Sequence, residues 1–320
     1  MSPRLPGSSG PGPARSLAPR VGDGALVLNE ASLPSPGPGV SGARPGPITP
    51  TLLPVKVVVF GLGLMGGSLA LALLRQPDFE VVGLDPSAAA RRLARRAGIA
   101  VAESAPAADL AVLAAPIPAL PGLLAGLRGW RGKVTDMAST KASVMGWAAR
   151  AGIDLVGGHP MCGSERSGFA AADPDLFQGA TWVLTREDAT VVHLVRAVGA
   201  RPLFMEPERH DRLAAKASHL AYLASVAYVL ATSEGDDWEG VKQLAASGYR
   251  DVSRLAAGDP DLYRPILESN REAVLDALTA LAEKLDAIRS RLETGGGELR
   301  DLLSAAKLAR DEWRSDAGSS

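Results

Sequence analysis

The amino-acid sequence predicts an α/β fold, in which a doubly wound parallel sheet is followed by an all-α domain. From Val55 onward, short apolar runs alternate with segments of helical periodicity, a pattern typical of parallel sheets with crossover helices. Beyond Glu206 these strand patterns stop, and long Ala/Leu-rich segments with helical periodicity replace them. The chain is therefore expected to form its sheet first and its helical domain second.

The first residues differ in composition from the rest of the chain. They are rich in Pro, Gly and Ser and contain too little apolar surface to offset the entropy lost on ordering. We therefore expect four regions: a disordered tail over 1–53, a sheet domain over 54–205, a helical substrate and dimerisation domain over 206–314, and a disordered tail over 315–320.

The individual elements follow from the same patterns. Strands are expected over 55–60, 79–84, 110–114, 133–136, 155–157 and 182–184, all within one sheet. In this region helices are expected from the glycine-rich turn through Leu74 and over 87–97. Beyond it they are expected over 213–232, 241–255, 265–292 and 298–314, with the glycines at 295–297 ending the third of these.

Composition excludes several classes of partner. The 34 Lys and Arg nearly balance the 35 Asp and Glu, so the net charge of -1 provides no footprint for nucleic acid or an anionic membrane surface. The single cysteine, Cys162, excludes a disulfide framework and a multi-cysteine zinc site, so we expect no metal and a cytoplasmic protein. No apolar run of about 18 residues predicts a membrane span, and the N-terminus lacks the apolar core of a signal peptide.

A glycine-rich turn follows the first predicted strand and opens a helix, which is the context of a dinucleotide-binding turn in a Rossmann-type domain. Gly61 permits the tight turn, Gly63 lets backbone N–H groups approach a pyrophosphate, and Gly66 allows close packing of helix on strand. A tight turn without a ligand is the structural alternative. The expected cofactor contacts are Gly61, Gly63, Leu64, Met65, Gly66, Asp85, Ala115 and Pro116.

Asp85 ends the second predicted strand, about 20 residues beyond the glycines, where a carboxylate accepts hydrogen bonds from the adenosine ribose. This position favours NAD over NADP. Asp85 also precedes Pro86 and Ser87, so a helix N-cap is its structural alternative. Arg91 and Arg92 leave NADP open, because a nearby arginine can accommodate a 2′-phosphate.

His159 follows an apolar predicted strand and is therefore expected at a strand's carboxyl end, where doubly wound sheets bind their ligands. An imidazole there can take a proton from a substrate hydroxyl while hydride leaves the adjacent carbon. A structural histidine in a turn explains the residue equally well from composition alone.

Several motifs together resemble the prephenate and arogenate dehydrogenases of tyrosine biosynthesis, and the resemblance covers roughly residues 54–314. The most specific is the His-Pro-x-x-Gly-x-Glu element at 159–165, whereas the glycine turn is shared with many dehydrogenases. The other matching segments are 61–69, Asp136 with 139–141, 159–168, 176–179, 218–220 and 249–254.

The resemblance implies NAD-dependent oxidative decarboxylation of prephenate to 4-hydroxyphenylpyruvate. By this resemblance, His159 takes the proton, Ser139 orients His159 or the substrate hydroxyl, and Arg254 binds a substrate carboxylate. An N-cap for Ser139 and a solvated helix face for Arg254 are the alternatives. By the same resemblance, the remaining substrate-site residues are Glu165, Ser218, His219 and Tyr222, where Tyr222 replaces a second histidine found in some relatives.

Three further residues lie beside the candidate site residues. Lys141 either neutralises a phosphate or substrate or is a surface lysine, Asp251 holds the structure around Arg254, and Cys162 is a small packing residue. Their assignments rest on position alone.

Competing functions remain open at this stage. Arogenate differs from prephenate only in an amine that replaces the side-chain keto group, and a catalytically silent NAD-binding sensor would also keep the glycine turn. β-Hydroxy acid dehydrogenases are disfavoured, because Lys216 is followed four residues later by Leu220 rather than asparagine. We expect neither an ACT-type regulatory domain nor a chorismate mutase fusion. The Ala/Leu faces of the helices predict a homodimer.

Overall fold

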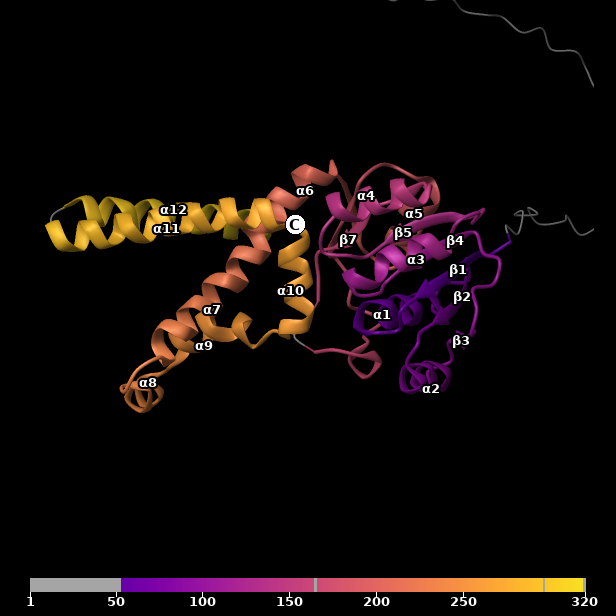
Figure 1. Cartoon of the computed structure of the whole chain (residues 1–320), viewed down its shortest axis with the longest axis horizontal. Helices are drawn as coiled ribbons and strands as arrows, with labels where there is room; N and C mark the ends of the chain where they lie inside the picture. The colour runs from indigo at the N-terminus through magenta and orange to yellow at the C-terminus, as the bar shows by residue number, and fades with distance from the viewer. Residues whose placement is uncertain (1–52, 164–165, 296, 319–320) are drawn as a thin grey trace, which may run out of the picture. The chain divides into compact units, whose positions relative to one another are not determined.

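Six parallel strands form the central sheet of the computed structural model, which describes residues 53–163, 166–295 and 297–318 (Figure 1). Their spatial order is β3-β2-β1-β4-β5-β6, so the order reverses between β1 and β4, as in a doubly wound fold. Their bounds are β1 Val55–Phe60, β2 Phe79–Leu84, β3 Ala100–Val101, β4 Leu110–Leu113, β5 Lys133–Asp136 and β6 Leu155–Val156.

Helices cover both faces of this sheet, which explains the continuous apolar runs of its strands. Val57 and Val59 of β1 belong to a core cluster with α1, whereas Val58 belongs to a second cluster with α3 and α4 on the other face. The bounds are α1 Leu64–Leu73, α2 Ala88–Arg96, the 3-10 helix η1 Ile117–Ala119, α3 Leu120–Gly126 and α4 Ala142–Ala151.

A second, three-stranded sheet follows and was not predicted. In it β8 pairs antiparallel with β7 and parallel with β9, so the strand expected over 182–184 lies outside the central sheet. His159 lies within β7, opposite Val183, rather than at the carboxyl end of the preceding strand, where it was expected. The bounds are β7 Gly158–Pro160, the 3-10 helix η2 Phe169–Ala171, β8 Thr181–Leu184, α5 Ala189–Ala197 and β9 Arg201–Phe204.

The remainder of the described chain is helical, as predicted, although its helices break at unpredicted places. The helix expected over 241–255 is divided into α8, α9 and η4, and that expected over 265–292 is divided at Asn270. The bounds are α6 Pro207–Ala214, the π-helix η3 Ala215–His219, α7 Leu220–Ser233, α8 Trp238–Leu244, α9 Ser247–Ser253, the 3-10 helix η4 Arg254–Ala257, α10 Pro260–Ser269, α11 Arg271–Thr294 and α12 Gly297–Gly318.

The end of the chain also differs from the expectation. Gly295 follows α11 with a φ of 71°, which ends that helix as predicted, and α12 lies beside α11 (Figure 1). However, α12 continues to Gly318, so residues 315–318 are helical rather than a disordered tail. The expected tail over 1–53 lies outside the described residues except for Leu53.

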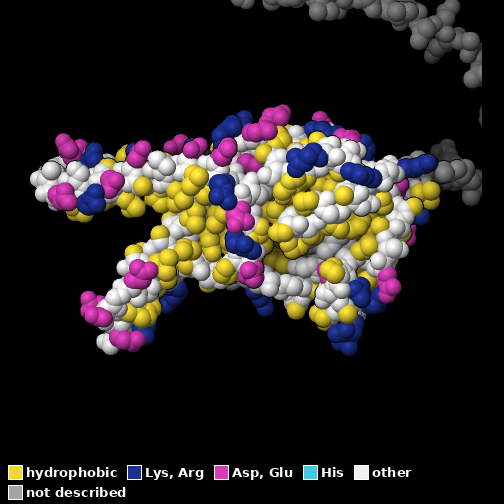
Figure 2. Space-filling view, in the orientation of Figure 1, with side chains coloured by type: hydrophobic (Ala, Val, Ile, Leu, Met, Phe, Trp, Pro, Cys, Tyr) yellow, Lys and Arg dark blue, Asp and Glu magenta, His cyan; other side chains and the backbone are white. Residues whose placement is uncertain are grey.

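α6, η3 and α7 join into one helix, Pro207–Ser233, which is long and apolar enough to cross a membrane by length and composition. Its most apolar window has a mean hydropathy of 1.3 and is 28% buried. This segment was not predicted as a membrane span from the sequence, and the core helices of soluble proteins also pass such a test. Hydrophobic side chains gather over α7 and α11 in Figure 2, and Leu230 and Leu275 are among the exposed ones.

Candidate active site

The glycine-rich turn has the close approaches that the sequence predicted. Gly61 has a φ of 99°, and a Cβ on Gly66 would lie 1.9 Å from the carbonyl oxygen of Gly61. Both positions therefore require glycine. The space beside Gly63 is open, and Gly63 precedes α1, whose first residues are Leu64 and Met65. An open approach to uncapped helix N–H groups fits a pyrophosphate.

The Asp85 carboxylate lies beside this turn. One oxygen accepts a hydrogen bond from the Leu62 N–H at 2.7 Å, and the other accepts one from the Ser87 N–H at 2.7 Å. The N-cap alternative for Asp85 is wrong, because the Ser87 hydroxyl caps α2 by accepting from the Ala90 N–H at 3.2 Å. Arg91 donates to the carbonyl oxygen of Asp85 at 2.7 Å, so its guanidinium also lies at this edge.

Because all strands of the central sheet are parallel, their carboxyl ends meet at one edge. The glycine turn follows β1 at that edge, Asp85 follows β2, and Ala115 and Pro116 follow β4. Ser139 follows β5 there and is half-buried. His159 follows β6 after two residues, so the predicted cofactor and proton-transfer residues share one edge.

A hydrogen-bonded chain of three side chains begins at His159. Its Nδ1 lies 2.8 Å from Nε2 of His210, and Nδ1 of His210 lies 2.8 Å from Oδ1 of Asp211. The Asp211 carboxylate accepts further hydrogen bonds from the backbone N–H groups of Lys141 at 2.7 Å and Ala142 at 2.9 Å, at the start of α4. Sequence reasoning did not identify His210 or Asp211.

The backbone before His159 is held by a buried ion pair between Lys141 and Asp136. Nζ of Lys141 donates to the carbonyl oxygen of Gly158 at 2.6 Å, and the Gly158 N–H donates to the Asp136 carboxylate at 3.0 Å. The surface alternative for Lys141 is wrong, because its side chain is fully buried and pairs with Asp136. Its proposed role in neutralising a phosphate or substrate stays a prediction.

The protein environment keeps the imidazole of His159 neutral. Burial lowers the pKa of His159 well below its usual value, and the nearby Lys141, His210 and His219 lower it further. Burial also lowers the pKa of His219 to about 4, although the charge of Asp211 opposes this shift. A neutral imidazole is the form that accepts a proton.

His219 lies close to this chain of side chains. Its Nδ1 accepts a hydrogen bond from Nδ2 of Asn270 at 3.3 Å, and the same Nδ2 donates to the carbonyl oxygen of Asp211 at 2.8 Å. His219 therefore lies in the same buried polar cluster as Asp211, close to His159 as the sequence predicted.

The other predicted substrate residues are not joined to His159 by the contacts of the described chain. Arg254 is exposed on η4, Ser218 is exposed on η3, and Tyr222 stacks on Tyr263 with ring centroids 3.7 Å apart. Glu165 lies outside the described residues.

Three smaller predictions have different outcomes. The N-cap alternative for Ser139 is wrong, because Lys141 occupies that position of α4. Burial raises the pKa of the Cys162 thiol to about 11, which agrees with a packing residue. Asp251 is exposed on α9, and its structural role stays a prediction.

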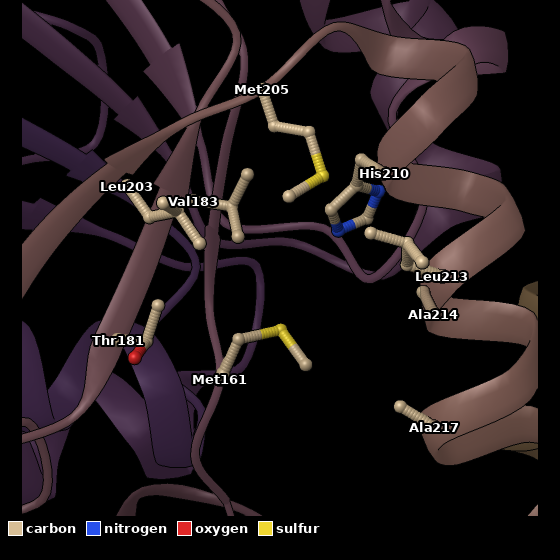
Figure 3. Close-up of a pocket in the computed structure, with 9 residues that line it drawn as sticks. All are labelled: Met161, Thr181, Val183, Leu203, Met205, His210, Leu213, Ala214 and Ala217. Atoms are coloured by element: carbon tan, nitrogen blue, oxygen red, sulfur yellow. The ribbon is translucent and has the colours of Figure 1, made fainter. Parts of the chain in front are cut away.

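A cavity of about 250 Å³ lies between the second sheet and the helix formed by α6 and η3 (Figure 3). Its walls are mainly apolar, and Figure 3 shows the His210 ring at one side, near Met205. None of its lining residues belongs to the glycine turn. They are Met161, Thr181, Val183, Leu203, Met205, His210, Leu213, Ala214 and Ala217. The described residues contain no cluster of His, Cys, Asp and Glu suited to a metal ion.

Known proteins match both regions of the chain. Residues 69–201 match the family described as "Prephenate dehydrogenase, nucleotide-binding domain", and residues 206–306 match "Prephenate dehydrogenase, dimerization domain". The prephenate dehydrogenase of Lactococcus lactis is 31% identical over 255 residues, which cover 74% of this chain and 71% of that protein. The prephenate dehydrogenase of Bacillus subtilis is 30% identical over 277 residues, which cover 80% of this chain and 74% of that protein.

Solved structures of prephenate and arogenate dehydrogenases are also similar to this chain. Prephenate dehydrogenase from A. aeolicus, in complex with hydroxyphenyl propionate and NAD+, has a TM-score of 0.76 at 26% identity and covers 82% of this chain and 99% of that chain. Arogenate dehydrogenase from Synechocystis has a TM-score of 0.71 at 28% identity, and the match covers 81% of this chain and 99% of that chain. The chain therefore belongs to the prephenate dehydrogenase family of oxidoreductases, with a nucleotide-binding domain followed by a dimerization domain.

Proposed function

We propose that this chain catalyses the NAD-dependent oxidative decarboxylation of prephenate to 4-hydroxyphenylpyruvate and CO2 in tyrosine biosynthesis. The observation that carries the proposal is the neutral, hydrogen-bonded imidazole of His159 at the same sheet edge as the glycine turn. Relatives named prephenate dehydrogenase at 31% and 30% identity support this substrate.

The residues of the chain account for the proton in this reaction. NAD, when bound, supplies a nicotinamide that accepts the hydride from the ring carbon bearing the hydroxyl. His159 takes the hydroxyl proton as the hydride leaves, which gives a ring ketone. The ring carboxylate then departs as CO2, its bonding electrons aromatise the ring, and His159 returns its proton to the phenolic oxygen. Ser139, at the same edge, orients His159 or the hydroxyl.

Asp85 supports NAD rather than NADP as the cofactor. Each oxygen of its carboxylate already accepts one backbone hydrogen bond and retains capacity for a ribose hydroxyl. A 2′-phosphate in that place would face a carboxylate. Gly61, Gly63 and Gly66, together with Leu64, Met65, Ala115 and Pro116, line the proposed path of the cofactor.

Arg254 is proposed to bind a carboxylate of the substrate, assisted by Glu165, Ser218, His219 and Tyr222. Prephenate is a dianion, and an arginine fork suits a carboxylate. We also propose a homodimer, in which the exposed apolar faces of the helical region are covered by a second copy. The proposed location of the protein is the cytoplasm, and neither a nucleic acid nor a membrane is proposed as a partner.

Arogenate is the second candidate substrate, because the arogenate dehydrogenase of Synechocystis is similar over nearly its whole length. Initial rates of NADH or NADPH formation with prephenate and with arogenate, each offered NAD and NADP, test these assignments. Preference for prephenate with NAD would support the proposal, preference for arogenate would change the substrate, and turnover of neither would favour a cofactor-binding sensor.

The His159→Asn variant tests the proton transfer within the same assay. We expect kcat to fall by about 100- to 10,000-fold, with the Kd of NAD unchanged in a fluorescence titration. An equal loss of cofactor affinity would contradict this role. Light scattering behind size-exclusion chromatography tests the homodimer, and a monomer at micromolar concentration would overturn it.

A further inference from the structure

Asp211 is held as an anion at the start of α4. Burial alone would raise its pKa, but hydrogen bonds from His210, Lys141 and Ala142 outweigh this effect and lower it. The two backbone donors belong to the N-terminus of α4, where a negative charge is also favoured by the helix dipole. Because an ionised carboxylate only accepts hydrogen bonds, the Nδ1 of His210 must donate.

This donor fixes which ring nitrogens of His210 and His159 carry a proton. With the ring proton of His210 on Nδ1, its Nε2 is the nitrogen that accepts from the ring nitrogen of His159 at 2.8 Å. His159 therefore carries its proton on Nδ1. Its Nε2 is left with a lone pair and has no hydrogen-bond partner within residues 53–163, 166–295 and 297–318.

The backbone of His159 is fixed independently of its ring. The buried pair of Asp136 and Lys141 binds both the N–H and the carbonyl of Gly158, one residue before His159. Lys141 contributes to both systems, since its backbone N–H binds Asp211 while its side chain binds Gly158. The start of α4 therefore anchors both the backbone and the ring of His159.

We propose that His210 and Asp211 are positioning residues, which hold His159 in the tautomer whose bare Nε2 receives the substrate proton. The tautomer is a property of the chain alone, and only its use in proton transfer rests on the proposed function. An imidazole held in the opposite tautomer would present an N–H to the hydroxyl and could not take its proton.

The first test is the nitrogen-15 spectrum of the full-length protein labelled at histidine, without cofactor or substrate, at neutral pH. The chain contains 4 histidines, so each signal can be assigned by substitution. We expect His159 and His210 to carry their proton on Nδ1, and His219 to carry it on Nε2, because its Nδ1 accepts from Asn270. A proton on Nε2 of His159 would overturn the proposal.

The second test compares two variants of His210. His210→Phe removes the acceptor but leaves the backbone bonds of Asp211, so we expect kcat to fall about 10- to 100-fold with KM little changed. His210→Gln restores an oxygen that can accept from His159, and we expect it to recover most of this loss. His193→Phe is the matched control, because His193 is exposed and stacks on Phe79.

The outcomes separate this inference from the proposed function. Wild-type kcat in His210→Phe, or a loss that His210→Gln does not reduce, would contradict the positioning role. If the wild-type protein turns over neither substrate, the proposed function fails, whereas the nitrogen-15 spectra still decide the tautomer. The spectra also decide it if His210→Phe does not fold.

Discussion

The surroundings of His159 and of Arg254 differ in how completely this chain supports them. His159 is fixed through its ring by His210 and through the adjacent backbone by a buried ion pair. Arg254 lies exposed on a short 3-10 helix, in a region where large apolar side chains such as Leu230 are also exposed. The proposed proton-transfer group is thus positioned within one chain, whereas the proposed carboxylate site is open.

This difference agrees with the tasks proposed for the two residues. Proton transfer depends on the placement and tautomer of one ring, which a buried hydrogen-bonded network can hold without rearrangement. Capture of a dianionic substrate needs an accessible cation, which must remain solvated until the ligand arrives. Substitutions should accordingly lower stability around His159 and affect substrate affinity around Arg254.

The largest effect is expected for Lys141→Met, which leaves Asp136 as a buried charge without its partner. We expect the free energy of unfolding to fall by about 3–5 kcal/mol in urea titrations, because loss of one member of a buried pair strands the other. Lys133→Met is the matched control, since its pair with Asp188 is at 3.2 Å and half-exposed on the lysine side. That change should cost less than about 1 kcal/mol. Equal costs would contradict the importance assigned to the buried pair.

A smaller effect is expected from acid. The folded pKa of His219 is about 4 against an ordinary 6.5, so the unfolded chain binds a proton there first as the pH falls. Stability from this group is complete above pH 6.5 and is lost towards pH 4, by at most roughly 3 kcal/mol. The lowered pKa of His159 acts in the same direction. Urea titrations across this window measure the slope, and His219→Asn should reduce it; a slope unaffected by that substitution would refute the assignment.

The smallest effect on the fold is expected for Arg254→Ala. We predict a KM for prephenate raised about 10-fold or more, with kcat and the unfolding free energy nearly unchanged, because an exposed arginine contributes binding rather than packing. Arg250→Ala, on the neighbouring α9, is a matched control that should leave KM unchanged. A comparable KM increase in both variants would indicate a general effect of positive charge instead.

The central sheet could be predicted closely because burial on both faces gives its strands a continuous apolar composition. The bounds of β1, β2 and β5 agree with the sequence prediction, and β4 ends one residue earlier. The strands β3, β7 and β9 were missed because none of them forms a buried apolar run: β3 has two residues, β7 contains Gly, His and Pro, and β9 is largely exposed. The break at Asn270 was missed because helical periodicity continues on both sides of it.

The site was only partly predictable, for a different reason. The glycine turn and Asp85 are close in sequence and follow a spacing rule, so their proximity could be inferred. His210 is 51 residues from His159, and Asp211 is 70 residues from Lys141, so tertiary contacts alone connect them. Adjacent histidine and aspartate in a chain with 4 histidines offered the one available signal.

The π-helix η3 gives the long helix an extra residue between His210 and His219. An uninterrupted α-helix turns by about 100° per residue and would place residues nine positions apart on nearly opposite sides. Here Asn270 bonds to both Asp211 and His219, so the two histidine positions face one cluster. Deleting one residue from 215–218 would restore regular winding and rotate all of α7 by roughly a quarter of a turn. The number of residues in this segment therefore constrains the site separately from the identity of its side chains.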